Sequence, residues 1–216
     1  AGYIEHNPLA RVSRVFAPPT VTPMPAVGWK DLPEVMRVMA DAPERMQILF
    51  LFSLCSMLRP GENAKLEKSW IHDDVIEIPA EHMKKRKPFR LPLTGFMREL
   101  LEREAALSPH PRCAFVFAAR VTGRHISAQA LAKHLHSTEL KGRLVAHGLR
   151  SIARSWLADE AVPFDVAEMC LSHDVGTQVS RAYQRSDFFD ARRSVMERWS
   201  EHVRACAESA GMIDWK

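Results

Sequence analysis

The feature that most constrains this chain is the stretch 46–58, which is strongly apolar along its length. A helix of this kind is stable in water only where other elements cover it. Its most apolar part, 48–54, is much shorter than the roughly 20 residues that span a bilayer. The stretch therefore predicts a central core helix of a globular protein, ended by Pro60-Gly61.

Amphipathic periodicity predicts further helices around this one. In 147–160, for example, apolar residues recur at intervals of three and four, as they do on one face of a helix. Ser127 is a suitable cap for a helix that begins near Ala130. The predicted helices are 32–39, 96–107, 130–135, 147–160, 166–171 and 189–209.

Short β-prone runs lie mostly in the first half of the chain. The runs 70–71 and 75–78 flank Asp73-Asp74, which is a turn signal, and 89–93 predicts another strand. A further short run lies at 114–117. We therefore expect an α+β fold that is mainly helical, with a small antiparallel sheet in the first half.

The N-terminal region reads differently, because five of the fourteen prolines lie between residues 8 and 25. Each proline fixes its φ angle and lacks an N–H, so this stretch is typical of an extended connector. We expect residues 1–28 to connect to a preceding domain. Residues 29–209 are expected to form one folded domain and 210–216 a C-terminal tail.

Positive charge is concentrated in the middle of the chain. The 30 Lys and Arg residues against 26 Asp and Glu give a net charge of +4, a mild bias that is compatible with a polyanionic partner. Segment 141–156 holds four bases and no acid. No signal peptide or membrane span is recognisable, which favours a cytoplasmic protein. Residues 84–90 hold five basic side chains: Lys84, Lys85, Arg86, Lys87 and Arg90.

The cysteines and histidines form no pattern typical of a metal site, and we expect neither a metal nor a cofactor. Cys170 lies three residues before His173, which is compatible with a thiolate nucleophile. A small buried side chain is the favoured interpretation, since free cysteines are usually buried. His134 and His136 are two apart, and on a helix they point to different faces.

Several local patterns carry candidate chemistry, and each has a simpler structural interpretation. Arg59 follows the buried helix, where it needs an anion or pairs with Glu62. The basic run 84–87 is either a solvated turn or a loop that binds nucleic acid. His147 and Arg150 are neighbours on one helix and could contact one phosphate.

His173 and Tyr183 close the series. Taken alone, the histidine could cap a helix and the tyrosine could be half-buried. Taken in order, the set resembles the active site of the tyrosine recombinases, also called phage integrases. The set consists of Arg59, Lys84, His147, Arg150, His173 and Tyr183.

The local sequences carry the same resemblance, which covers about residues 32–203. Leu-Arg-Pro-Gly-Glu surrounds Arg59, His-Gly-Leu-Arg occupies 147–150, and Leu-Ser-His precedes Tyr183. Three further segments are similar to the integrases of satellite phages and genomic islands. They are Ile-Pro-Ala-Glu-His-Met-Lys at 78–84, Ala-Tyr-Gln-Arg at 182–185 and Met-Glu-Arg-Trp at 196–199.

The resemblance implies a tyrosine-recombinase catalytic fold and an enzyme that breaks and rejoins DNA without metal or ATP. Arg59, Arg150 and His173 would grip the scissile phosphate, and Tyr183 would attack it to form a 3′-phosphotyrosine. Lys84 would protonate the departing 5′ oxygen, and His147 would assist proton transfer at the tyrosine.

Other basic residues would contact the DNA backbone. Lys84 is preferred over its neighbours as the general acid because of its spacing to Pro92. The arm-binding and core-binding domains of the family are absent from this chain, which affects affinity and site choice. The expected backbone contacts are Lys85, Arg86, Lys87, Arg90 and Arg154.

The expected partners are double-stranded attachment sites, a tetramer of the full-length protein on DNA, and accessory DNA-bending or directionality factors. The isolated domain is expected to be a monomer, of bacterial or phage origin, associated with the nucleoid rather than a membrane. The final helix is expected to pack on its own core rather than on a neighbouring protomer. Alternative functions are a DNA-binding-only module, a topoisomerase IB-like nicking–closing enzyme and a metal-dependent nuclease.

Overall fold

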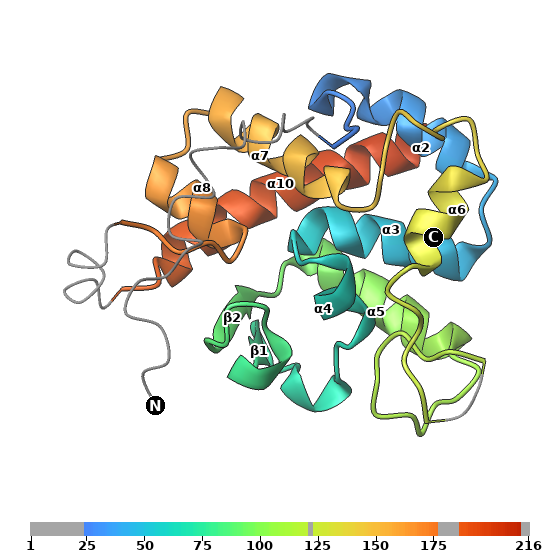
Figure 1. The fold of residues 1–216 in the computed structure, drawn as a ribbon, viewed down its shortest axis with the longest axis horizontal. Coiled ribbons are helices and arrows are strands. Elements are labelled where there is room, and N and C mark those ends of the chain that lie inside the picture. The colour runs from blue at the N-terminus through green and yellow to red at the C-terminus, as the bar shows by residue number, and fades with distance from the viewer. Residues whose placement is uncertain (1–23, 121–122, 177–185, 213–216) are drawn as a thin grey trace, which may run out of the picture.

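The computed structural model describes residues 24–120, 123–176 and 186–212 (Figure 1). No helix within these ranges has both the length and the apolar character needed to cross a membrane. The strands are β1 (Val75–Ile78) and β2 (Phe89–Pro92), and short 3-10 helices cover Trp29–Asp31, Lys68–Trp70 and Ala80–His82. The α-helices are α2 (Leu32–Ala40), α3 (Glu44–Ser56), α4 (Pro60–Ala64), α5 (Gly95–Leu107), α6 (Ala130–His136), α7 (Gly148–Asp159), α8 (Phe164–Cys170) and α10 (Phe189–Ser209).

Helix α3 is the centre of the core, as its apolar sequence predicts. It packs between α5 and α10, with contacts to α7 as well (Figure 1). The predicted end of this helix was wrong by a few residues. The helix ends at Ser56, its C-cap Met57 adopts a left-handed conformation with φ of 54°, and Pro60 begins the short helix α4. Proline suits that position, because the first turn of a helix leaves its N–H groups unpaired.

Helix α10 packs against its own chain, contacting α2, α3, α5 and α8. Trp199 is fully buried, and its indole Nε1 donates a hydrogen bond of 2.9 Å to the carbonyl of Leu54 on α3. Val195 and Val203 are buried on the same stripe. The expected packing of the final helix on its own core is therefore what the structure shows.

The sheet is a two-stranded antiparallel hairpin in the first half of the chain, in which Val75 pairs with Pro92 and Ile78 with Phe89. Two predicted β segments were wrong. Trp70 belongs to a 3-10 helix and Ile71 makes one isolated bridge to β1, while 114–117 also makes only an isolated bridge. Both runs are too short for their propensity to outweigh local packing.

A smaller correction concerns α6. Its N-cap is Gln129 rather than the predicted Ser127. The hydroxyl of Ser127 instead accepts the Gln129 N–H at 3.2 Å, one step before the helix begins. The mainly helical α+β fold with one small antiparallel sheet is otherwise confirmed.

The N-terminal segment reaches the start of α7. The carbonyl of Pro25 accepts the N–H of Val145 at 3.3 Å. The same carbonyl oxygen lies only 2.6 Å from the position that a Cβ on residue 148 would take. Gly148 is therefore required by this close approach, which explains the glycine beside His147.

A buried ion pair joins α3 to α5. Glu104 is fully buried, and its carboxylate accepts hydrogen bonds of 3.0 and 3.2 Å from Nε of Arg45. Burial raises the pKa of Glu104 although Arg45 acts to lower it. Removing the ionised carboxylate from water costs free energy, and its pairing with Arg45 offsets part of that cost.

We predict that Arg45→Met lowers the free energy of unfolding by about 3 kcal/mol at neutral to alkaline pH, because it leaves a buried carboxylate unpaired. The folded-state pKa is raised, so the loss should shrink as pH falls and Glu104 takes up a proton. Urea unfolding at several pH values measures both effects. The double variant Arg45→Met/Glu104→Gln is the control and should lack the pH dependence that Glu104 contributes. An Arg45→Met loss that is independent of pH would contradict the prediction.

Candidate active site

The guanidinium of Arg150 lies at the centre of the site. Only 4% of this residue is exposed, in the first turn of α7. Its Nη2 donates to the carbonyl of Leu171 at 2.7 Å, and its Nη1 donates to the carbonyl of Met57. Burial, and then the charge of Arg59, lowers the pKa of Arg150 to about 10, so it remains cationic at neutral pH.

Arg59 approaches the same point from the start of α4. Its Nη1 donates to Oε1 of Glu62 at 3.1 Å and to Oγ of Ser172 at 2.9 Å. The pairing with Glu62 that was the simpler interpretation is thus present. The same guanidinium also reaches Ser172, in the segment that carries His173, while its contact with an anion stays a prediction.

Glu62 was not among the predicted site residues, although it organises this corner. It is buried, and its carboxylate accepts the backbone N–H groups of Arg59 at 2.9 Å and of Lys84 at 3.3 Å. It thereby links α4 to the basic loop between the strands. The only sequence signal for it was its place three residues after Arg59.

His173 lies directly against Arg150, with its Nε2 3.0 Å from Nη2 of the guanidinium. Its other ring nitrogen, Nδ1, lies 2.7 Å from Oε2 of Glu168 on α8. The preceding residue, Ser172, adopts a left-handed backbone with φ of 53°. That conformation is uncommon outside glycine and turns the chain sharply between α8 and His173.

His147 and Lys84 complete the described part of the set. Both are exposed, and His147 immediately precedes α7. Partial burial lowers the pKa of His147, and the charges of Arg150, Arg59, Lys84 and His173 lower it further. The structure therefore brings five of the six predicted catalytic residues around one point. The sixth, Tyr183, lies outside the described residues.

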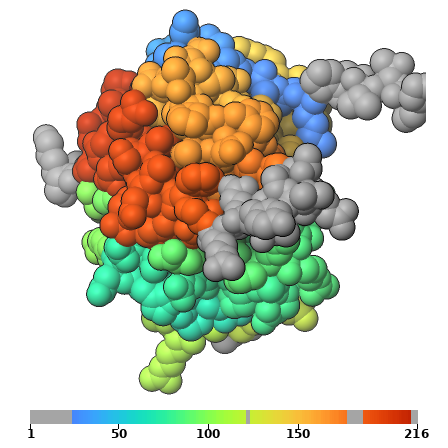
Figure 2. Space-filling view, turned by 90° about the vertical axis from the view of Figure 1, so that its left-hand side faces the viewer, coloured from blue at the N-terminus to red at the C-terminus, as the bar shows by residue number. Residues whose placement is uncertain are grey.

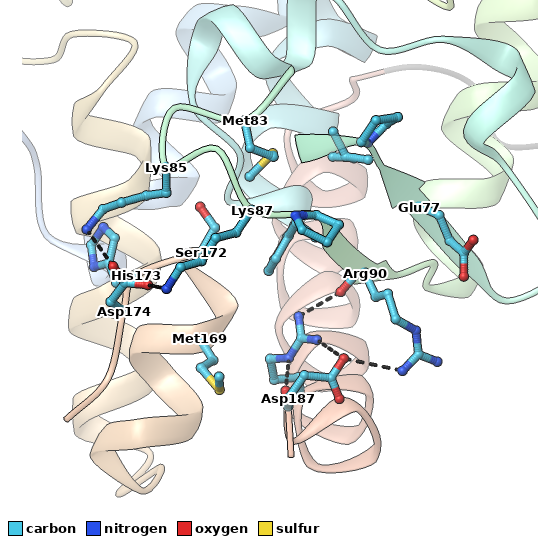
Figure 3. Close-up of a pocket in the computed structure, with 15 residues that line it drawn as sticks. Glu77, Met83, Lys85, Lys87, Arg90, Met169, Ser172, His173, Asp174 and Asp187 are labelled. Atoms are coloured by element: carbon cyan, nitrogen blue, oxygen red, sulfur yellow. Dashed lines mark hydrogen bonds and ion pairs between the residues drawn. The ribbon is translucent and has the colours of Figure 1, made fainter. Parts of the chain in front are cut away.

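A cavity of about 520 Å³ opens beside this cluster, between the hairpin, the end of α8 and the start of α10 (Figure 3). It is lined by His173 of the cluster and by Ser172, which binds Arg59. Figure 2 shows this face of the molecule, where the orange region of α7 and α8 and the red helix α10 lie above the green hairpin. The cluster of predicted catalytic residues therefore lies at the edge of this cavity.

Most of the other predicted contact residues are paired with acids in this structure. Lys85 and Lys87 both point to Asp174, with Nζ at 3.2 and 2.8 Å from its two carboxylate oxygens (Figure 3). Their bonds, that of Lys87 first, hold the pKa of Asp174 below its usual value despite some burial. Arg90 and Arg154 are paired with Asp187 and Glu168, at 3.3 and 2.8 Å.

Arg86, the remaining member of that set, is exposed and has a left-handed backbone with φ of 54°. It lies in the loop that joins the two strands. Four of these five predicted contact residues are thus bound to carboxylates. A DNA phosphate would have to displace the carboxylate before it could bind any of the four.

Two other kinds of site would carry different chemistry, a metal centre and a cysteine nucleophile. Among the described residues, no three His, Cys, Asp or Glu side chains are grouped so that they could hold a metal ion. Cys170 is buried at the end of α8, and desolvation raises the pKa of its thiol to about 12. A thiol held in this way is not a thiolate nucleophile at neutral pH.

Comparisons with known proteins point to one family. The model of the "Phage integrase family" matches residues 29–189. The prophage integrase IntA of Escherichia coli K12 is 33% identical over 217 residues, which cover 98% of this chain and 52% of that protein. The prophage integrase IntZ of the same strain is 28% identical over 162 residues, which cover 74% and 40%. The chain thus spans about half the length of the curated relatives it matches.

Solved structures show the same fold. A lambda integrase dimer bound to a COC′ core site superposes with a TM-score of 0.62 at 15% identity, over 86% of this chain and 66% of that one. The integrase from mycobacterium phage Brujita superposes with a TM-score of 0.62 at 19% identity, over 94% and 70%.

We predict that tetrahedral oxyanions bind the cation cluster. Sulfate should raise the melting temperature more than chloride at equal ionic strength, and at ten times its Kd the gain in unfolding free energy should be about 1.4 kcal/mol. Arg59→Ala should remove most of this gain, because it deletes one of the converging donors. Arg143→Ala, which removes an exposed arginine paired with Glu34, serves as the control. Equal sulfate stabilisation of both variants would contradict the prediction.

Proposed function

The chain belongs to the phage integrase family, and on this premise we propose that it is the catalytic domain of a site-specific tyrosine recombinase. The observation that carries the proposal is the convergence of Arg59, Arg150 and His173 around one point, with Lys84 and His147 beside them. Such a cluster suits the non-bridging oxygens of one phosphodiester. The proposed division into connector (1–28), catalytic domain (29–209) and tail (210–216) stays a prediction.

In the proposed reaction, Tyr183 attacks the scissile phosphorus while the bond to the 5′ oxygen breaks. A phenol is a weak nucleophile at neutral pH, because its unperturbed pKa is about 10. Neighbouring cations favour its deprotonation, and His147 assists by taking the proton. The lowered pKa of His147 keeps its imidazole neutral at neutral pH and thus able to accept.

The leaving oxygen also needs a proton, which Lys84 supplies in this proposal. Its backbone N–H is bound to Glu62 at 3.3 Å, which supports its placement beside Arg59. The products are a 3′-phosphotyrosine and a free 5′-hydroxyl. The covalent link retains the phosphodiester energy, so the 5′-hydroxyl of another strand can attack it and rejoin DNA without ATP. Fixed cations stabilise the charge of the transition state, and no metal takes part in these steps.

The proposed partners follow from the same premise. The related structures include a lambda integrase dimer bound to a core site and a lambda integrase tetramer bound to a Holliday junction. We propose that the full-length protein forms a tetramer on two double-stranded attachment sites, aided by accessory DNA-bending or directionality factors. The reaction would integrate or excise a mobile element in the bacterial nucleoid.

Two other functions use the same fold. A DNA-binding-only module would bind DNA without forming a covalent link. A topoisomerase IB-like enzyme would relax supercoils without exchanging partners. The presence of all five described residues of the predicted catalytic set favours catalysis over binding alone.

We predict that the wild type forms a covalent adduct with nicked suicide duplexes, randomised around the cleavage position, in the presence of EDTA. The nick lets the 5′-hydroxyl fragment leave, so that the phosphotyrosine link accumulates and is visible on a denaturing gel. Tyr183→Phe should form no adduct, because it lacks the attacking oxygen.

Binding of the same duplexes by Tyr183→Phe is the control that the variant is folded. Cleavage of the duplexes without a covalent adduct, lost when EDTA is added, would favour the metal-dependent nuclease. Failure of the wild type to form an adduct, both as this chain and joined to a core-binding domain, would favour the binding-only module.

A second prediction concerns Asp174, which pairs with Lys85 and Lys87. DNA phosphates would have to displace its carboxylate from both lysines. Asp174→Asn should therefore tighten DNA binding about three- to tenfold at low salt, since exposed ion pairs are worth up to about 1 kcal/mol each. Fluorescence anisotropy over a range of salt concentrations measures the effect. Asp165→Asn, an exposed change of the same charge on α8, is the matched control. Equal tightening by both variants would mean that only net charge matters.

A further inference from the structure

Glu168 holds His173 at both its backbone and its ring. The backbone N–H of His173 donates to the carbonyl of Glu168 at 3.0 Å, at the end of α8. The carboxylate Oε2 lies 2.7 Å from Nδ1 of the imidazole. Two independent contacts from one residue therefore set where the ring lies.

The second oxygen of the same carboxylate is also occupied. Oε1 accepts a hydrogen bond of 2.8 Å from Nε of Arg154 on α7, and the Glu168 side chain is only 19% exposed. Burial alone would raise the pKa of Glu168, but the bonds from His173 and Arg154 lower it overall. The group facing the imidazole is therefore a carboxylate, which can only accept hydrogen bonds.

This arrangement selects one tautomer of the neutral ring. Because the carboxylate accepts, Nδ1 of His173 carries the proton, and Nε2 keeps its lone pair. That lone pair is 3.0 Å from Nη2 of Arg150, which can only donate. The contacts on both sides of the ring agree on the Nδ1–H form.

The ring nitrogen that faces Arg150 is also the one nearest to the proposed phosphate site. A phosphate oxygen accepts hydrogen bonds, so Nε2 must gain a proton to donate to it. Nδ1 keeps its proton and its carboxylate partner in both states, and only Nε2 changes from acceptor to donor. The proton that it gains comes from solvent, and no covalent bond changes.

We propose that Glu168 is a positioning residue for His173, which it fixes in the orientation and the Nδ1–H tautomer that direct Nε2 at the scissile phosphate. The inference rests on the proposed function for the identity of the anion, but the tautomer itself is a property of the protein alone. It also gives Arg154 a role other than contact with DNA, because Arg154 holds the second oxygen of Glu168.

The tautomer can be measured without DNA. The protein is labelled with ¹⁵N-histidine, and long-range ¹H–¹⁵N spectra are recorded near pH 9, where histidine side chains are neutral. His173→Asn identifies the signals of this residue by their loss. In the wild type we expect a protonated Nδ1 and an unprotonated Nε2. In Glu168→Ala the ring loses the acceptor at Nδ1 and keeps only the contact with Arg150, so the share of the Nε2–H form should rise.

The consequence for catalysis is measured under single-turnover conditions, with the suicide duplexes that trap the wild-type adduct. Glu168→Ala should slow adduct formation on the order of ten- to a hundredfold, the range found when the partner that orients a metal-bound histidine is removed. The Kd for DNA should change less than threefold. Glu160→Gln, which breaks an exposed pair with Arg198, is the matched control and should alter neither quantity.

The outcomes separate this inference from the proposed function. A wild-type ring in the Nε2–H form would overturn the role of Glu168, whether or not DNA is cleaved, and this measurement needs no variant that must fold. An unchanged tautomer and rate in Glu168→Ala would overturn it as well. Absence of an adduct in the wild type would instead remove the proposed function and leave the tautomer to be decided by the spectra.

Discussion

The rest of the site depends on the way in which the charge of Arg150 is buried. Besides Nε2 of His173, its hydrogen-bond partners are two backbone carbonyls, of Met57 after α3 and of Leu171 after α8. Both lie at helix C-termini, where the helix dipole favours a cation. A guanidinium held by dipoles rather than by a carboxylate keeps its whole charge for an incoming anion. The same side chain links α7, which carries it, to the ends of α3 and α8. The packing of these three helices therefore fixes the position of the charge.

The two acids at the site, Glu62 and Glu168, bind residues around Arg150 and make no hydrogen bond to its guanidinium in the described structure. Glu62 holds Arg59 and the backbone of Lys84, while Glu168 holds His173 and Arg154. Glu168 thus binds the ring nitrogen of His173 that lies opposite the one facing Arg150. This division explains how like charges gather in one place. The repulsion between them is offset by pairs that lie around the cluster and leave its middle positive.

The sequence predicted most helices, because their apolar periodicity reports directly which face is buried. It also predicted five of the clustered residues, because their local motifs and their order along the chain resemble the active site of the tyrosine recombinases. It could not reveal Glu168, because the value of that residue depends on a contact between α8 and the following turn rather than on any spacing. The end of α3 was misplaced for a similar reason. Met57 takes a left-handed conformation in which its carbonyl binds Arg150, a tertiary requirement that no local propensity reports.

The close approach of Pro25 to Gly148 also bears on where this protein can be cut. By sequence pattern the folded unit begins near residue 29, yet the Pro25 carbonyl already fills the space above Gly148 and pairs with Val145. A fragment that starts at residue 29 would lose this cover directly beside His147. Expression fragments and fusion junctions therefore belong before Pro25, and the boundary of the catalytic unit is set by steric contact rather than by where the regular secondary structure begins.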